Sequence, residues 1–374
     1  MAADTLCQTP WGAVRLLRYP ARRDEPLQAW CSADLLLLEA LHELAADGAG
    51  ILAVNDEHGA LAVASGARAV WTDSALAAQA LARNLTANER APVAITWSVD
   101  PPPATSTVVL LRIPKQLPYF EYQLASLAAA TAPETMVLAA GMDKHLSPRV
   151  AALLEQYIGP TRRHPGQRKA RLFTARRDLR VAAAPPADVA YRCAAAGGEL
   201  RALPAVFSRD RLDGGSRLLL QVLPQLPAAD RVIDLACGNG VLGLAALQQG
   251  LARQLLFADE SAMAIASARA NLVRLFPAAL ANCDFHHGDG LQDCAWGPAG
   301  LILCNPPFHL NHTVDAYAGR RLLAQCARHL APGGTLCLVA NRHLDYGAAL
   351  RRDFSRISKL AGDSRFTVWR ACRA

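Results

Sequence analysis

The stretch RVIDLACGNGVLGLAAL, residues 231–247, joins a short apolar run, a glycine-rich turn and a second apolar run with helical spacing. A strand, a tight turn and a helix in this order are typical of a doubly wound α/β domain. Gly238 and Gly240 lack a Cβ, so the backbone can turn tightly there and a ligand can approach it closely. The stretch therefore predicts an α/β fold with a ligand at the turn.

Strand and helix patterns go on alternating after this stretch, which predicts a mostly parallel, doubly wound sheet. A strand ends at Asp259, and Ser261 can cap the helix that follows. A third strand precedes Asp289, and the apolar run of residues 300–304 stops at Asn305. Ligands of open α/β sheets bind at the carboxyl ends of the strands, so these polar residues are candidates for one site.

The first half of the chain repeats this plan in weaker form. GILAVNDEHGALAVA (50–64) resembles the first strand, turn and helix start, and TVVLLRIPKQL (107–117) takes the place of GLILCNPPFHL (300–310). We interpret the halves as two similar α/β domains from a duplication; the alternative is that any two doubly wound domains resemble each other. The expected organisation is a domain over 1–180, a linker over 181–194 and a domain over 195–374.

The two copies differ where chemistry is expected. Residues 55–58 of the first copy read NDEH, which places acidic side chains where an approaching cofactor needs bare backbone. Residues 112–115 read RIPK in place of the segment that begins at Asn305. The N-terminal copy is therefore predicted to be degenerate, without cofactor binding or catalysis, and to serve as a platform for the substrate.

Composition excludes several classes of protein. No run of 18 or more apolar residues occurs, and the first twenty residues lack the apolar core of a signal peptide, so we expect a cytoplasmic protein without a membrane partner. The ten cysteines include no C-x-x-C pair and no histidine at ligand spacing, so neither a disulfide framework nor a metal site is expected. Two internal domains make a monomer sufficient.

A basic segment lies between the two copies. Residues 159–180 contain eight Lys or Arg and one acidic residue, in a protein of net charge +7. Such a cluster can follow the phosphates of a nucleic acid, and we take Arg168, Lys169 and Arg171 as candidate RNA-binding residues. The alternative is a solvated linker or a strand edge protected by charge.

The glycine turn admits two cofactor classes. Its spacing satisfies G-x-G-x-x-G formally, which allows a nicotinamide dinucleotide. Asp234, however, would repel a pyrophosphate and suits a cationic amino-acid ligand. The turn resembles motif I of the class I S-adenosylmethionine (SAM)-dependent methyltransferases, with Ala236 at the first glycine. By that resemblance Asp259 binds the ribose diol and Asp289 the adenine amine, although Asp289 also fits an ordinary turn before a glycine.

The tetrad after residue 304 resembles motif IV of the amino-methyltransferases, [DNS]-P-P-[FYW]. The side-chain oxygen of Asn305 and the carbonyl of Pro306 can accept the two hydrogens of a planar amine and expose its lone pair. Phe308 can stack on the base. Pro307 and His309 are candidate substrate contacts, and His309 is either a proton acceptor or a polar wall.

The segments VFSRDRLDGGSRLLLQVLP (206–224), CNPPFH (304–309) and VANRHLDY (339–346) resemble the bacterial ribosomal RNA guanine-N2 methyltransferases of paired-domain type, over essentially the whole chain. PLQAW, IPK and ANRHLDY are most similar to the enzyme for the large subunit. The resemblance implies two tandem Rossmann-like domains and SAM-dependent methylation of one guanosine N2 amine in 23S rRNA. It also places Asp213 and Gly215 near the methionine end of the cofactor.

Other functions stay open at this stage. A small-subunit rRNA enzyme, an N6-adenine methyltransferase and a protein-glutamine methyltransferase would share Asn305 and the turn. The formal glycine spacing leaves a nicotinamide-dependent oxidoreductase as a second class. A third class is a non-catalytic RNA-binding protein.

Overall fold

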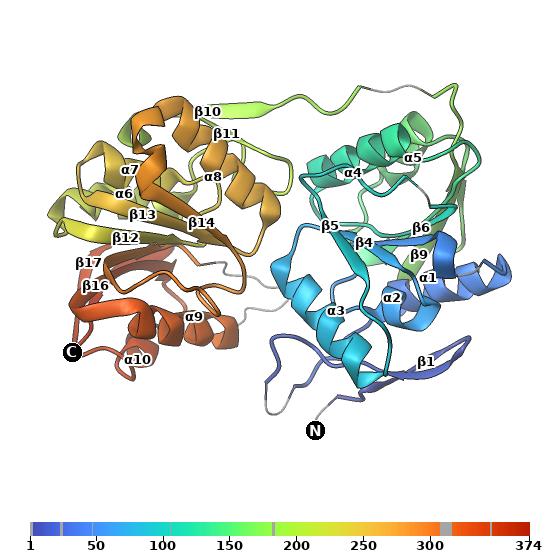
Figure 1. Cartoon of the computed structure of the whole chain (residues 1–374), viewed down its shortest axis with the longest axis horizontal. Helices are drawn as coiled ribbons and strands as arrows, with labels where there is room; N and C mark the ends of the chain where they lie inside the picture. The colour runs from blue at the N-terminus through green and yellow to red at the C-terminus, as the bar shows by residue number, and fades with distance from the viewer. Residues whose placement is uncertain are drawn as a thin grey trace. The chain divides into compact units, whose positions relative to one another are not determined.

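The computed structural model describes residues 3–22, 25–46, 48–104, 106–181, 184–306, 316–344 and 346–374. The chain divides into two compact units, Met1–Ala187 and Asp188–Ala374, each built around its own sheet of seven strands (Figure 1).

The second unit is a doubly wound sheet in the strand order β14-β13-β12-β15-β16-β18-β17. Its first five strands in that order pair in parallel, and β18 pairs antiparallel with both of its neighbours. The strands are β12 (Ala229–Leu235), β13 (Ala252–Asp259), β14 (Cys283–His287), β15 (Ala299–Cys304), β16 (Leu330–Asn341), β17 (Arg356–Gly362) and β18 (Phe366–Cys372). The helices are α6 (Gly214–Val222), α7 (Val241–Gln248), α8 (Ala262–Leu275), α9 (Ala316–His329) and α10 (Tyr346–Leu350).

The first unit has a sheet of the same topology, in the order β5-β4-β3-β6-β7-β9-β8. A hairpin of β1 (Leu6–Thr9) and β2 (Gly12–Arg15) precedes it. The strands are β3 (Ile51–Val54), β4 (Ala69–Thr72), β5 (Ala94–Trp97), β6 (Val108–Arg112), β7 (Met136–Met142), β8 (Thr161–Arg163) and β9 (Ala170–Arg176). The helices are α1 (Ser32–Glu43), α2 (Ala60–Ser65), α3 (Ala75–Ala87), α4 (Leu117–Ala130) and α5 (Val150–Tyr157).

The common strand order confirms the predicted pair of α/β domains. The registers agree as well, because Val54 lies opposite Leu111 in the first sheet and Leu235 lies opposite Cys304 in the second. The residues that follow Leu111 and Cys304 are Arg112 and Asn305. Arg112 and Asn305 therefore occupy equivalent positions at the carboxyl ends of the corresponding strands β6 and β15.

The central strands of the second unit are buried on both faces, as expected for parallel strands between helices. Val232, Leu255 and Leu301 pack with apolar residues of α6, α7 and α8 on one face. Ile233 and Leu256 pack with α9 and α10 on the other. With both faces covered, the carboxyl ends of the strands are left as the place for a ligand.

The boundary between the units differs from the expected one. Strand β10 (Val189–Cys193) pairs antiparallel with β11 (Gly198–Ala202), and both belong to the second unit. Residues 189–193 were expected in the linker because an alanine- and proline-rich segment precedes them. Their pairing with β11 makes them part of the domain.

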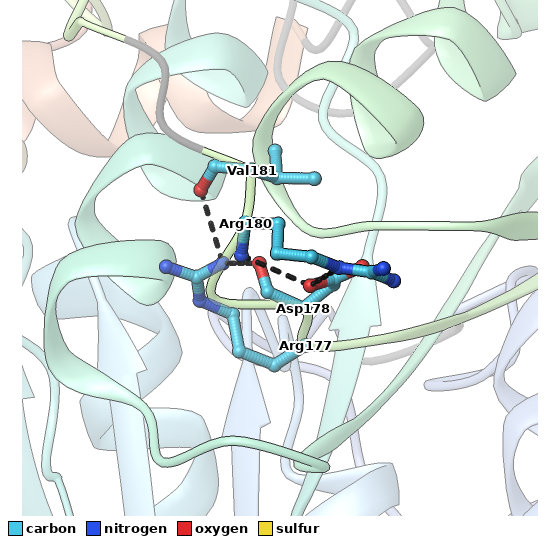
Figure 2. Close-up of polar contacts among 4 residues, drawn as sticks. All are labelled: Arg177, Asp178, Arg180 and Val181. Atoms are coloured by element: carbon cyan, nitrogen blue, oxygen red, sulfur yellow. Dashed lines mark hydrogen bonds and ion pairs between the residues drawn. The ribbon is translucent and has the colours of Figure 1, made fainter.

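The end of the first unit uses part of the basic segment internally. The guanidinium of Arg177 donates to the carbonyls of Asp178 and Val181, and Arg180 forms an ion pair with Asp178 (Figure 2). Arg177 Nε also donates to the carbonyl of Ala128 in α4 at 3.0 Å. Arg177 therefore fastens the chain after β9 to α4 of its own domain, and the pair of Arg180 with Asp178 is local to this segment.

Candidate functional site

The glycine-rich turn lies between β12 and α7, and three of its residues have left-handed backbone conformations. The φ angles are 58° at Ala236, 54° at Gly238 and 85° at Gly240. A Cβ placed on Gly238 would meet nothing closer than Val206 at 3.9 Å, so the space beside this residue is open. One on Gly243 would lie 2.5 Å from the Phe257 ring, so this glycine lets α7 pack closely against β13. An open backbone turn at a helix start can accommodate a nucleoside cofactor.

Asp234 supports this turn from inside the domain. The residue is fully buried, and its Oδ2 accepts a hydrogen bond from the Gly243 backbone N–H at 2.7 Å. Its Oδ1 has no hydrogen-bond donor among the residues that the structure describes. Burial raises the pKa of Asp234 to about 8, the charge of Asp259 adds to the rise, and the bond from Gly243 opposes it. Direct contact of Asp234 with the cofactor stays a prediction.

Asp259 joins the turn to the next strand and helix. One carboxylate oxygen accepts from the Gly238 N–H at 2.9 Å, and the other from the Ser261 N–H at 3.0 Å. Ser261 in turn caps α8 by accepting from Ala264 N at 3.1 Å. The carboxylate thus holds the turn and the start of α8 together, and its predicted role toward a ribose has not been tested.

Asp289 has a partner that the sequence did not indicate. Its side chain is 1% exposed, and both of its oxygens form short contacts with the guanidinium of Arg321 in α9. Gln325, one turn further along α9, donates to the Asp289 carbonyl at 3.1 Å and accepts from Leu291 N at 2.9 Å. This carboxylate is therefore already bound within the protein, and its predicted contact with an adenine amine stays a prediction.

Asn305 directly follows β15 and is held by the start of α6. Its Nδ2 donates to Asp213 Oδ2 and to Ser216 Oγ, both at 2.9 Å. Asp213 is the N-cap of α6 and also accepts from Ser216 N at 2.9 Å. The Asn305 Oδ1 is buried and receives no hydrogen bond from any described residue. Because both Nδ2 hydrogens are donated within the protein, the orientation of the amide is fixed and Oδ1 is left as an acceptor. This arrangement is expected for a group that binds an amine hydrogen.

The neighbouring tetrad residues are only partly described. Pro306 is buried directly after Asn305. Pro307, Phe308 and His309, for which substrate contacts are predicted, lie outside the described residues.

The predicted site residues of the second unit come together at one edge of its sheet. β13, β12 and β15 are neighbours, and Asp259, Asp234 and Asn305 lie at or next to their carboxyl ends. Sequence reasoning did not indicate two partners, Ser216 of Asn305 and Arg321 of Asp289. An Asp followed three residues later by Ser is a helix-start signal at 213–216, but it does not reveal a contact with Asn305.

At the corresponding edge of the first sheet, side chains occupy the place where the second unit has an open backbone turn. Asn55, with φ of 57°, exchanges hydrogen bonds with Gln123 at 2.8 and 3.0 Å and donates to the Arg112 carbonyl. The guanidinium of Arg112 pairs with Asp34 of α1 in a largely buried contact. These hydrogen bonds and the ion pair engage both side chains within the first unit, which is the pattern expected of a degenerate domain.

The candidate RNA-binding residues lie on the hairpin of β8 and β9. Arg168 and Lys169 form its turn, with φ of 52° and 60°, and Gln167 and Ala170 exchange backbone hydrogen bonds across it. Arg168 pairs with Glu39, and Arg171 pairs with Asp143 at 3.2 Å. Two of the three cations therefore have acidic neighbours within the first unit.

The described part of the chain shows neither a metal-binding cluster nor a membrane-spanning helix. Within the described ranges, no group of three or more His, Cys, Asp or Glu side chains is arranged to hold a metal ion. No helix in that part of the chain is both long and apolar enough to span a bilayer.

Family comparisons cover both units. The RLMG N-terminal domain model matches residues 4–179, and the methyltransferase small domain model matches residues 197–370. The chain is 39% identical to the ribosomal RNA large subunit methyltransferase G of Alcanivorax borkumensis, over 96% of this chain and 95% of the relative. It is 40% identical to the protein of the same name from Ectopseudomonas mendocina, over 98% and 99% of the two chains.

A solved structure shares the whole two-domain fold. The T. thermophilus 16S rRNA N2 G1207 methyltransferase, in complex with AdoMet and guanosine, aligns with a TM-score of 0.74 over 99% of this chain and 98% of its own. At 20% identity the likeness shows the fold alone. The matched methyltransferase domain makes SAM the cofactor and removes the nicotinamide alternative. The chain is a class I methyltransferase and belongs to the ribosomal RNA large subunit methyltransferase G family.

Proposed function

We propose that this protein methylates the exocyclic N2 amine of one specific guanosine in 23S rRNA, with SAM as the methyl donor. The large-subunit rRNA methyltransferase names of its full-length relatives support the substrate class. The cofactor supplies an electrophilic methyl group on a sulfonium. The residues that would hold it are Asp259 and the turn around Gly238 and Gly240, where the backbone is open.

The observation that carries the proposal is the state of the Asn305 amide. Its two amide hydrogens are both used inside the protein, and its buried Oδ1 is left as an acceptor. A guanine N2 amine is a poor nucleophile because its lone pair is delocalised into the ring. An acceptor for one amine hydrogen helps to localise that lone pair, and Pro306, Pro307 and Phe308 would supply a second acceptor, a stiff turn and a stacking ring.

The second unit is the catalytic domain in this proposal, and the first unit binds RNA. The hydrogen bonds and the ion pair that engage Asn55 and Arg112 within the first unit argue against chemistry there. Its β8–β9 hairpin presents Lys169 on a turn and the exposed Arg162 and Arg163 on a strand. Cations on an exposed hairpin can follow a phosphate backbone. The protein would act in the cytoplasm as a monomer.

Analysis of rRNA from a strain that lacks the gene tests this function. Mass spectrometry of nuclease digests should show the loss of one N2-methylguanosine from 23S rRNA. Plasmid-borne wild-type protein should restore that nucleoside, whereas an Asn305→Ala protein expressed to the same level should not. Loss of the nucleoside from 16S rRNA would assign the enzyme to the small subunit, and unchanged rRNA would refute the proposal.

A further inference from the structure

We propose that Asp213 and Ser216 are positioning residues, which set the orientation of the Asn305 amide so that Oδ1 faces the substrate amine. The inference rests on the proposed function, because it assigns Asn305 to the binding of that amine. It adds to the tetrad two residues that lie 92 and 89 positions away in the sequence.

The chemistry of Asp213 determines which way the amide points, and Ser216 completes the hydrogen bonds of Nδ2. Asp213 accepts hydrogen bonds when ionised and cannot donate. Its Oδ2 lies 2.9 Å from Asn305 Nδ2, and a reversed amide would place two oxygens against each other at that point. Ser216 Oγ accepts the second hydrogen at 2.9 Å, so both hydrogens of Nδ2 have partners. Loss of Asp213 removes the group that disfavours the reversed amide, and loss of Ser216 leaves one Nδ2 hydrogen without its partner.

The start of α6 is built so that these contacts are close. Asp213 caps the helix by accepting from Ser216 N, which ties the two partners to each other. A Cβ added at Gly215 would lie 3.0 Å from Asp213 Oδ2 and 3.2 Å from Asn305 Oδ1. Both distances are shorter than an ordinary van der Waals contact, so a glycine here eases the close approach of the helix start to the amide. Asp213, Gly215 and Ser216 therefore form one surface around Asn305.

The first unit shows that the fold itself brings these positions together. Helix α1 packs on β7 as α6 packs on β16. Asp34 is the third residue of α1, as Ser216 is of α6, and Asp34 binds Arg112 as Ser216 binds Asn305. The first copy fills both positions with charges that neutralise each other. The second copy fills them with an acceptor and an amide, which leaves one oxygen available.

Single-turnover methyl transfer to rRNA from the deletion strain tests the inference through a double-mutant cycle. Asp213→Ser keeps a helix cap but withdraws the carboxylate from Asn305, and Ser216→Ala removes the second acceptor. We expect the rate to fall about tenfold or more for Asp213→Ser and about fivefold for Ser216→Ala. Ser216→Thr, which keeps the hydroxyl, should recover most of the rate. Calorimetric SAM affinity should change by less than about threefold in Ser216→Ala and Ser216→Thr, whereas Asp213→Ser is judged by its rate, because the family resemblance places Asp213 near the cofactor.

The decisive comparison is made in the Asn305→Ala background. If both residues act through the amide, adding Asp213→Ser or Ser216→Ala to Asn305→Ala lowers the rate no further. Ser74→Ala, which removes the side-chain cap of α3 in the first unit, is the control for a general loss of helix stability. Equal losses with and without Asn305 would overturn the inference, because the residues would then act on folding alone.

A readout without activity separates this inference from the proposed function. In protein labelled with ¹⁵N-asparagine, the side-chain signals of Asn305 are identified by their loss in Asn305→Ala. Their hydrogen exchange should be slow in the wild type and faster in Ser216→Ala and Asp213→Ser. Unchanged exchange would overturn the positioning role, even in an active enzyme. A wild type that transfers no methyl group to rRNA would instead refute the proposed function.

Discussion

Arg112 and Asn305 stand at the same position of two sheets with the same strand order, and each binds the third residue of an equivalent helix. In one unit the contact is an ion pair between Arg112 and Asp34 that closes on itself. In the other it leaves the Asn305 Oδ1 buried without a described partner. In the proposed function, this difference in chemistry at one shared geometry separates a degenerate domain from a catalytic one.

Substitutions at two glycines of the turn should separate an effect on stability from an effect on SAM binding. Gly243→Ala places a methyl group 2.5 Å from the Phe257 ring, and we expect it to lower the free energy of unfolding by about 1–3 kcal/mol. Gly238→Ala fills open space beside the turn, so it should weaken SAM binding with a smaller loss of stability, about 1 kcal/mol from the left-handed backbone. Urea unfolding and SAM calorimetry measure the two effects, and identical behaviour of the variants would contradict this assignment.

The stability of the protein without cofactor should fall as the pH rises toward 8. Burial lifts the pKa of Asp234 from 3.8 to about 8, so the folded state holds a proton that the unfolded state releases. The stabilisation is complete below pH 3.8 and is lost progressively up to about pH 8. Asp234→Asn keeps an acceptor for Gly243 N and should make the dependence of the midpoint of thermal unfolding on pH less steep between 5 and 8, where Asp56, whose pKa burial raises to about 7, contributes the remainder. An equally steep profile in this variant would assign the effect to other groups.

The ion pair between Asp289 and Arg321 should be structurally important. Arg321→Ala leaves a buried carboxylate without its cation, which costs about 3–5 kcal/mol in comparable sites. Arg253→Ala is the matched control, because its pair with Asp230 is 3.6 Å long and more than four-fifths exposed at both partners, so its loss costs about 1 kcal/mol or less. Chemical unfolding of both variants measures the difference, and equal stabilities would show that Asp289 does not depend on Arg321.

The β8–β9 hairpin should contribute to RNA affinity. Lys169→Ala and Arg163→Ala should each raise the Kd for 23S rRNA fragments and reduce the slope of log Kd against log salt concentration by about 0.7–0.9. Neither residue should alter SAM binding, because both belong to the first unit. Arg180→Ala, whose side chain is engaged by Asp178, is the control for a simple loss of charge. A salt dependence unchanged in the hairpin variants would remove this surface from the RNA interface.

The fold and much of the site can be predicted because their signals are local. Residues 231–247 carry a strand, a turn and a helix within one continuous pattern, and Asp259 and Asn305 each end an apolar run. Neighbouring parallel strands then bring these ends to one edge of the sheet. The equivalence of Arg112 and Asn305 followed from the same patterns and was confirmed by the sheet registers.

Contacts between distant segments could not be predicted in this way. Ser216 and Asp213 reach Asn305 only after α6 has packed on the sheet, and Arg321 reaches Asp289 from the polar side of α9. Residues 189–193 form a strand because β11 supplies hydrogen bonds, whereas the alanine- and proline-rich segment before them indicates a linker. Arg177 likewise belongs to a basic run, yet its side chain binds carbonyls of its own domain. In each case a partner that is distant in the sequence determines what the residue does in the structure, and the local sequence does not reveal that partner.

The most direct test of the central claim is methyl transfer by purified Asn305→Ala. With labelled SAM and 23S rRNA from the deletion strain, the wild type should incorporate one methyl group at a guanine N2. Asn305→Ala should lower kcat by about 10²–10³-fold while the Kd for SAM stays within about threefold of the wild-type value. A variant that methylates the same guanosine at the wild-type rate would contradict the assignment of Asn305 as the acceptor for the substrate amine.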